Sequence, residues 1–549
     1  MKKKPSRNEP CPCGSSKKFK RCHGGPNAAH EELSCRGTEL ARQSATVHRI
    51  QLERQQGLGR GIISAVSSEM RLVVVGARKL RGDWQTFHDF LYAYAMDVIG
   101  QDWFRAEADK PAAVRHPIFN WHARLMTLAN ASQCVSDHIK RIPLTGAINA
   151  YLTLAYDLYT LEHNASQAHT PGIKERLFHR LKHPDQFVGV RYEVRVAAMF
   201  LRAGFDLIWE DETDGTSRHC EFTATYPKTG RSFAVECKMR NQSTGAKSQS
   251  GFGKFVGLVG DALLKNTDAD RLVFVDINTP AKARALDSPY DWRTAAVSDL
   301  RRFEGSKQAE GLPSALIFIT NFPDHHHLDE SVADAGSILE GFKTADYRTG
   351  EPTTIRQKIQ LRERLPEVEA LFASMIEHSE VPSTFEGEIA GLEDTSRLLI
   401  GHRYQMDDGQ IGLLEDVCVH EQDGQVSLAL QMEDGSRAIY QNQLSEDEFI
   451  AWKRYPETFF GDVRQRQGRI DDPMEFFDRM LQVYSQTPKE KLLGFMAPEP
   501  GLVREELSAL EQPELATLYA EHITNAALLR AGPQPIPANM RWMRKPPAR

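Results

Sequence analysis

The fold predicted for the centre of the chain depends on one stretch, residues 189–242, which reads GVRYEVRVAAMFLRAGFDLIWEDETDGTSRHCEFTATYPKTGRSFAVECKMRNQ. Apolar and other side chains alternate over 233–238. Alternation with a period of two is typical of a β-strand, and it places Glu236 and Lys238 on one face of that strand.

A second strand is predicted over 220–225, where Glu221 alternates with apolar residues. If the two strands pair, Glu221 and Glu236 can meet on one face. Mg²⁺ prefers carboxylate and water oxygens, so two convergent carboxylates suit it. Lys238, two residues further along, can position an attacking water and balance charge. These residues are the minimum needed for metal-assisted phosphodiester cleavage. A solvated strand surface is the alternative for the same pattern, and the surrounding elements decide between the two.

A helix is predicted from 187 to 203, and Glu193 falls on its apolar stripe. A buried carboxylate is costly unless it is paired or bound to a cation. After the strand at 233–238 come a polar and basic loop, a helical stretch to about residue 266, and the apolar strands RLVFVDI and ALIFIT. The predicted fold is therefore a mixed sheet flanked by helices, with 205–210, 219–225 and 231–238 as consecutive strands.

This order of elements, with these residues, resembles the PD-(D/E)XK nuclease superfamily, the restriction-endonuclease-like fold, over about 187–320. The resemblance implies that Glu221 is the first metal carboxylate, on the second strand. It places Glu236 and Lys238 at the acid and lysine of the third strand. Glu193 matches the helix acid of many members. Glu221 replaces the more usual aspartate, and Asp214 is the alternative first ligand.

By this resemblance, Glu221 and Glu236 bind Mg²⁺ or Mn²⁺, with the Cys237 carbonyl as a further ligand. Lys238 positions the water, and Glu193 binds a second metal or tunes the first. Three basic residues in or near the loop after the strand are candidate phosphate contacts; they are Arg240, Lys247 and Lys254. Family analogy points to DNA repair or bacterial defence against foreign DNA, with DNA favoured over RNA as substrate.

The amino end carries a second signal, RNEPCPCGSSKKFKRCHG at 7–24. Cys11, Cys13, Cys22 and His23 have the spacing C-x-C-x8-C-H, which suits tetrahedral Zn²⁺. So short a segment has almost no apolar core, so the metal would supply most of its folding free energy. The segment resembles the SEC-C motif, a zinc module that contacts a chaperone and the ribosome in the Sec translocase motor. No P-loop sequence is present, so motor activity is excluded.

Composition describes a soluble protein of 549 residues, 41% hydrophobic and 26% charged, with a net charge of −6. Residues 1–23 hold eight Lys or Arg against one Glu, and 406–448 hold eleven acids against one Arg. The basic end can touch nucleic acid or an acidic protein, and the acidic segment favours a protein partner. Sparse cysteines and the lack of a signal peptide or an 18-residue apolar run predict a cytoplasmic protein without a membrane span. Its oligomeric state is left open.

The predicted organisation is multidomain α/β plus helical. Three Asp-Gly turns, at 408–409, 423–424 and 434–435, separate four short strands and indicate a small meander or SH3-like barrel. The predicted parts are a zinc motif at 1–30, a helical domain at 31–185, a nuclease-like domain at 186–330, a helical connector at 331–383, a small antiparallel β domain at 384–460 and a helical tail with a disordered end at 461–549.

Three adjacent histidines stand in the stretch DHHHLDE at 324–330. Neighbouring residues rarely aim at one metal, so a solvated loop is predicted there.

The sequence leaves two functions open. The first is a Mg²⁺-dependent nuclease. The second is a non-catalytic adapter whose zinc motif binds nucleic acid, a ribosome or a chaperone.

Overall fold

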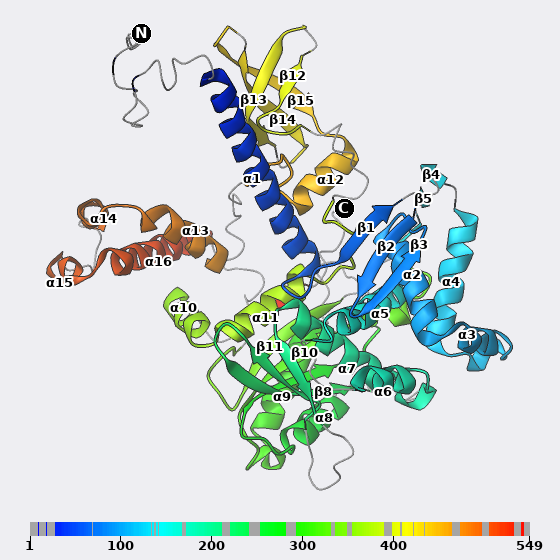
Figure 1. The fold of residues 1–549 in the computed structure, drawn as a ribbon. Helices are drawn as coiled ribbons and strands as arrows, with labels where there is room; N and C mark the ends of the chain where they lie inside the picture. The colour runs from blue at the N-terminus through cyan, green and yellow to red at the C-terminus, as the bar shows by residue number, and fades with distance from the viewer. Residues whose placement is uncertain are drawn as a thin grey trace. The chain divides into compact units, whose positions relative to one another are not determined.

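The structure is a computed structural model of the chain (Figure 1). It divides into two compact units, Met1–Glu53 with Gly387–Arg466, and Arg54–Glu386 with Gln467–Arg549. The residues it describes are 9, 18, 28–67, 70–132, 134–136, 139–140, 142–166, 172–210, 220–240, 253–280, 292–330, 335–348, 354–388, 398–406, 409–420, 422–432, 434–463, 473–496, 504–531 and 540–542.

The larger unit is built on a seven-stranded mixed sheet of order β16-β11-β10-β9-β8-β7-β6. Strands β6, β7 and β8 are antiparallel neighbours, whereas β8, β9 and β10 run parallel. The prediction of a mixed sheet is confirmed. The bounds are α7 Pro184–Arg202, β6 Asp206–Trp209, β7 Phe222–Tyr226, β8 Arg231–Met239, α8 Gly253–Leu263, β9 Asp270–Asp276, α9 Trp292–Glu304 and β10 Ala315–Asn321.

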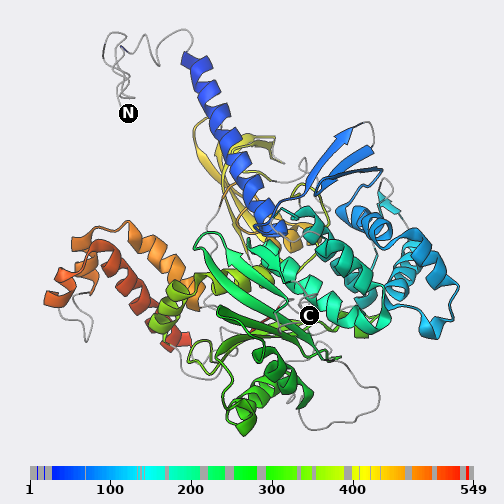
Figure 2. The same ribbon diagram turned by 60° about the horizontal axis from the view of Figure 1, so that its bottom comes forward.

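Helices cover both faces of this sheet (Figure 2). Val235 of β8 and Phe274 of β9 point into one apolar cluster, which they share with α7 and other helices. Val273 and Val275, the alternate residues of β9, point into a second cluster with α8 and α9. Strands buried on both faces explain the near-continuous apolar runs of β9 and β10.

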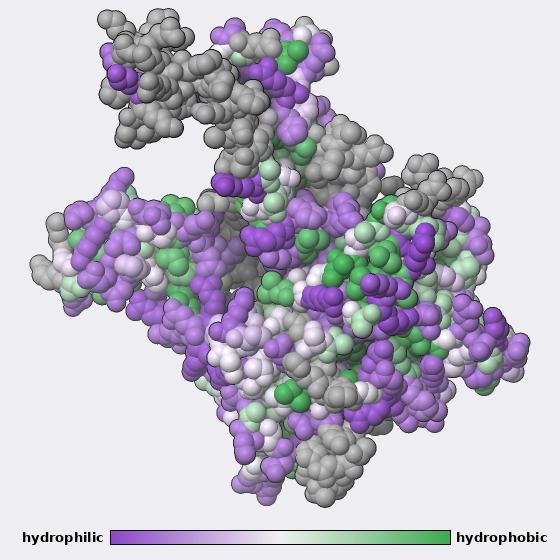
Figure 3. Space-filling model, viewed as in Figure 1, coloured by the Kyte–Doolittle hydropathy of each residue, from purple (hydrophilic) through white to green (hydrophobic). Residues whose placement is uncertain are grey.

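The segment predicted as a helical domain also contains a three-stranded antiparallel sheet, β1-β2-β3, so that prediction is incomplete. The outer strands are short and largely exposed, and they lack the clear apolar alternation that marks a half-buried strand. Apolar side chains show on the surface over this sheet (Figure 3), among them Ile63, Val66 and Leu72. The bounds are β1 Ile63–Ser67, β2 Met70–Val75, β3 Arg78–Gly82, α2 Phe87–Ile99, α3 Gln101–Ala108, η2 Ala112–Val114, α4 Pro117–Ala131, β4 Cys134–Ser136, β5 Ile139–Lys140, α5 Gly146–His163 and α6 Ile173–Leu181.

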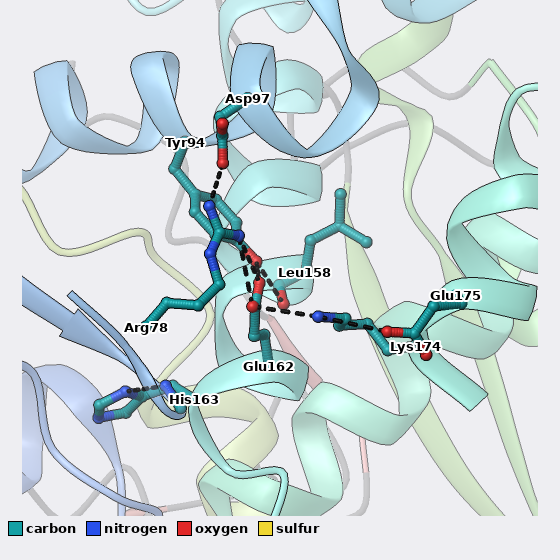
Figure 4. Close-up of polar contacts among 9 residues, drawn as sticks. Arg78, Tyr94, Asp97, Leu158, Glu162, His163, Lys174 and Glu175 are labelled. Atoms are coloured by element: carbon teal, nitrogen blue, oxygen red, sulfur yellow. Dashed lines mark hydrogen bonds and ion pairs between the residues drawn. The ribbon is translucent and has the colours of Figure 1, made fainter. Parts of the chain in front are cut away.

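A buried carboxylate ties this small sheet to the helices. Glu162 of α5 accepts hydrogen bonds from the Tyr94 hydroxyl at 2.8 Å and from Lys174 at 3.2 Å, and Arg78 of β3 reaches it at 3.4 Å (Figure 4). Arg78 also pairs with Asp97. Because every group around Glu162 donates a proton to it, we read this network as structural.

Two predictions for the carboxyl half need correction. The connector predicted as helical at 331–383 begins with strand β11, which pairs antiparallel with β10. The end predicted as disordered contains strand β16, which pairs with β11. The bounds are η3 Lys307–Ala309, η4 Pro323–His326, β11 Gly336–Phe342, α10 Ile355–Arg364, α11 Pro366–Glu377, α13 Pro473–Ser485, α14 Lys489–Met496, α15 Arg504–Ala509, α16 Gln512–Ala531 and β16 Met540–Trp542.

The smaller unit contains an antiparallel four-stranded meander of order β12-β13-β14-β15. Gly409, Gly424 and Gly435 all have φ near +80°, the conformation that a glycine adopts without strain at a hairpin turn. A meander is one of the two predicted arrangements. The bounds are α1 Ala28–Gln56, β12 Arg403–Gln405, β13 Ile411–Val419, β14 Gln425–Met432, β15 Arg437–Gln443 and α12 Glu446–Arg454.

None of the helices in the described residues combines the length and the hydropathy that a membrane-spanning segment needs.

Candidate functional site

Glu236 is a charged residue inside the central sheet. It lies in the middle of β8, in register with Val273 of β9, and is only 1% exposed. The ammonium group of Lys238 contacts its carboxylate, and Lys265, which follows α8, places Nζ 3.6 Å from Oε1. Residues in register on parallel strands share a face, so Glu236 lies on the side of the sheet that α8 and α9 cover.

Glu221 directly precedes β7. Its backbone N–H donates to the Val235 carbonyl at 3.0 Å, and Phe222 pairs with Val235, so Glu221 adjoins Glu236 in the ladder. Burial and the charges of Glu193 and Glu236 raise the pKa of Glu221 to about 8. The two carboxylates that the sequence predicted to meet are therefore close enough to repel each other.

Glu193 joins the same electrostatic group from helix α7. It is 7% exposed, and both of its oxygens accept hydrogen bonds from the Arg180 guanidinium at 3.1 Å. The bidentate pair explains how a carboxylate is tolerated on the apolar stripe of the helix. Arg180 lies on α6, and the sequence analysis did not select it.

The charges of this group also act on its other titratable members. Burial alone would lower the pKa of Lys238, but Glu236 and Glu221 outweigh burial and the pKa is raised, so this lysine is held as a cation. Burial raises the pKa of the Cys237 thiol well above its usual value, and Glu221, Glu193 and Glu236 add to the effect. Cys237 is therefore held as a neutral thiol. We call Glu193, Glu221, Glu236 and Lys238 the carboxylate cluster.

The carboxylate oxygens of Glu221 and Glu236 are the donors that the cluster offers to a cation. Among the described residues, Oε2 of Glu236 is buried and has no hydrogen-bond partner. Within the same residues, no side-chain hydrogen bond or ion pair involves the Glu221 carboxylate. No group of three or more His, Cys, Asp or Glu side chains in the described chain is arranged to hold a metal. Mg²⁺ usually takes only one or two carboxylates and completes its shell with water and substrate oxygens, so the donor set fits it.

Most of the remaining predicted residues lie outside the described part of the chain. Asp214 and Lys247 lie outside the described residues, and Lys254 is described only as a backbone position in α8. Arg240 follows β8 and donates from Nε to the Ile277 carbonyl at 2.7 Å. The predicted zinc ligands also lie outside the described residues; they are Cys11, Cys13, Cys22 and His23.

A second polar group, which the sequence did not reveal, lies at the carboxyl ends of β9 and β10. Oδ1 of Asn278 lies 2.9 Å from Nε2 of His325 and 2.7 Å from Nε2 of His326, and Nδ2 of Asn278 donates to the Arg240 carbonyl at 2.8 Å. Since Nδ2 must donate, Oδ1 must accept, and both imidazoles carry their proton on Nε2. The prediction of a solvated histidine loop is wrong, because these rings are partly buried in a hydrogen-bonded network.

Burial, and then a nearby cation, keeps these histidines neutral. Nη2 of Arg191 lies 3.2 Å from Nδ1 of His325. Burial, together with Arg191, lowers the pKa of His325 well below its usual range and that of His326 to about 4. Asp276 anchors the backbone of the same loop by accepting from the Asn278 N–H at 2.7 Å, and burial raises its pKa to about 6. We call Arg191, Asp276, Asn278, His325 and His326 the histidine network.

The comparisons with known proteins concern the amino end. Residues 7–25 match the SEC-C motif, a zinc-binding type of motif, in agreement with the sequence analysis. No curated protein and no solved structure matches the chain. The match covers a small part of the chain and does not include the central sheet.

Proposed function

We propose that the protein is a metal-dependent nuclease whose site is the carboxylate cluster. The observation that carries the proposal is the meeting of Glu221, Glu236 and Lys238 on neighbouring strands of the central sheet. The element order supports it: helix α7, three antiparallel strands, helix α8, then the parallel strand β9. That is the order expected from the PD-(D/E)XK resemblance.

The residues have distinct roles in this proposal. Glu221 and Glu236 would hold Mg²⁺ or Mn²⁺, which when bound supplies Lewis-acid polarisation of the phosphate and a more acidic water. Lys238, held as a cation, positions the attacking water and offsets charge on the phosphate oxygens. Glu193, fixed by Arg180, adds negative charge and favours retention of a cation. Arg240 remains a proposed phosphate contact, together with Lys247 and Lys254.

DNA is the favoured substrate because of the family resemblance. RNA is the second candidate, because it presents the same phosphodiester to the site. The test is cleavage of single- and double-stranded DNA and RNA in Mg²⁺, Mn²⁺ or EDTA. We compare wild type with Glu236→Ala, Lys238→Ala, Glu221→Ala and Asp214→Ala. One positioned catalytic group contributes about 10²–10⁴ in rate, so each loss at a true site residue should be plain. Asp214→Ala should matter less than Glu221→Ala.

Equal activity of wild type and Glu236→Ala would assign any cleavage to a contaminant or another site. No cleavage of any substrate would favour the second candidate, a non-catalytic adapter. The SEC-C match supports that alternative, because in the adapter the zinc motif would bind a nucleic acid, a ribosome or a chaperone. The acidic meander is a second surface for a protein partner.

A further inference from the structure

A pair of histidines stands at the joint between α6 and α7, outside the carboxylate cluster. His179 belongs to the last turn of α6, and His183 caps the first turn of α7. Both side chains are exposed, and their Nε2 atoms lie 3.5 Å apart. The backbone of His183 is extended, and the tight turn that joins α6 to α7 brings its ring beside that of His179.

The backbone that carries the pair is well fixed. The His183 N–H donates to the Arg180 carbonyl at 3.1 Å, and the His183 carbonyl accepts from Phe187 at 2.9 Å. On the opposite side of α6, Leu177 and Leu181 are buried at 1% exposure or less. Two ligands on packed helical turns are held in place before a metal arrives, and this lowers the entropy cost of binding it.

The spacing of the two nitrogens matches a shared metal ion. Zinc–imidazole bonds are about 2.0–2.1 Å long, so two nitrogens at a tetrahedral angle lie about 3.4 Å apart. Direct hydrogen bonding explains the arrangement less well, since 3.5 Å is long for an N–H···N contact. Two cations, Arg180 and Lys182, lie between the two histidines in sequence. Arg180 is paired with Glu193, which limits its repulsion of an incoming ion.

We propose that His179 and His183 form a two-imidazole binding site for a divalent transition metal ion such as Zn²⁺, Ni²⁺ or Cu²⁺. Imidazole nitrogen suits these ions, and water completes their coordination. Binding clamps the end of α6 to the start of α7. This site shares no ligand with the carboxylate cluster, and it stands whether or not the protein is a nuclease.

The test uses the full chain with Cys11→Ser and Cys22→Ser, so that the predicted zinc motif does not compete for metal. Cu²⁺ is the probe, because it binds nitrogen sites most tightly in the divalent series. We expect an electron paramagnetic resonance spectrum with two equatorial imidazole nitrogens and about one tightly bound Cu²⁺ per chain. His179→Ala and His183→Ala should each weaken binding at least tenfold and remove the two-nitrogen signature.

His48→Ala, which removes an exposed histidine of α1, is the matched control and should bind as its parent does. Thermal melts in EDTA check that the variants fold, and Ni²⁺ should raise the melting temperature of the parent but not of His183→Ala. Unchanged Cu²⁺ affinity and spectrum in both His179→Ala and His183→Ala would overturn the proposal. Glu236→Ala should keep the Cu²⁺ signal, which separates this site from the proposed nuclease centre.

Discussion

The pKa of Glu221 links the carboxylate cluster to the stability of the protein. Its pKa is raised to about 8 by burial and by Glu193 and Glu236, from an ordinary value of 4.5. Between these two pH values the folded protein keeps a proton that the unfolded chain has released. The contribution of Glu221 to stability is therefore largest below pH 4.5, falls as pH rises, and levels off above about pH 8.

We therefore expect metal-free wild type to lose more stability between pH 5.5 and 8.5 than Glu221→Gln, which cannot titrate at this position. The difference should amount to at most about 1.4 kcal/mol per pH unit. Urea unfolding in EDTA at several pH values measures it. A stability difference between the two proteins that stays constant with pH would contradict the account of this residue.

Asn278 connects the histidine network and has a left-handed backbone, with φ of 47°. Asn278→Ala removes the acceptor of two imidazole N–H groups and the donor to Arg240, and should destabilise the protein by about 1–3 kcal/mol. Asn278→Gly loses the same hydrogen bonds but adopts this φ without strain, so it should be the milder change. Chemical denaturation ranks the variants, with exposed Asn266→Ala as the control. Equal stability of wild type and Asn278→Ala would refute the role.

Site residues could be selected from the sequence where a local strand or helix pattern determines which face a side chain lies on. Glu221, Glu236 and Lys238 were selected because strand alternation fixes their faces, and Glu193 because it interrupts an apolar stripe. Lys265 was missed because it reaches Glu236 from a helix end that no local pattern ties to β8. The histidines were misplaced because their burial depends on Asn278, 47 and 48 residues away.

At the scale of elements, the start of α5 depends on a close approach that only glycine permits. A Cβ on Gly146 would lie 2.2 Å from the Asp324 carbonyl oxygen and 2.3 Å from that of His327. Those carbonyls belong to the segment of η4, which carries the histidine network. The first turn of α5 and η4 therefore share a contact with no room for a methyl group.

We expect Gly146→Ala to force this contact apart and to destabilise the protein by about 1–3 kcal/mol, as overpacking of a tight site does. Gly257→Ala is the control, because nothing lies within 4 Å of its Cβ position in α8 and alanine favours a helix. Thermal melting should fall for the first variant and rise slightly for the second. A Gly146→Ala protein as stable as wild type would refute the close approach.

Elements with strong local signals were predicted well. The hairpin glycines at 409, 424 and 435 separate strands β12–β15 much as the Asp-Gly turns indicated. The sheet β1–β3 was not part of the predicted helical domain, because β1 and β3 leave their side chains in contact with water. Strand β11 was missed because its place in the sheet is set by pairing with β10 and not by a local pattern.

At the scale of the molecule, the zinc motif should behave independently of the larger unit. We predict about one Zn²⁺ per chain in protein purified without added metal, and loss of that zinc in a Cys11→Ser, Cys22→Ser double variant. Because the motif lies at the amino end, the variant should keep the main unfolding transition of wild type. Elemental analysis and thermal melting provide the two readouts. Full zinc content in the double variant would contradict the assignment.

The proposal that the carboxylate cluster cleaves phosphodiester bonds can be tested with a single pair of proteins. Wild type and Glu236→Gln, purified identically, are incubated with plasmid DNA in Mn²⁺, and the initial cleavage rates are measured. Glutamine keeps the size of the side chain but removes its charge. We predict that wild type cleaves DNA and that EDTA abolishes the cleavage. The rate for Glu236→Gln should be at least about 10²-fold lower than the rate for wild type. Equal rates for the two proteins, or no cleavage of DNA or RNA by wild type, would contradict it.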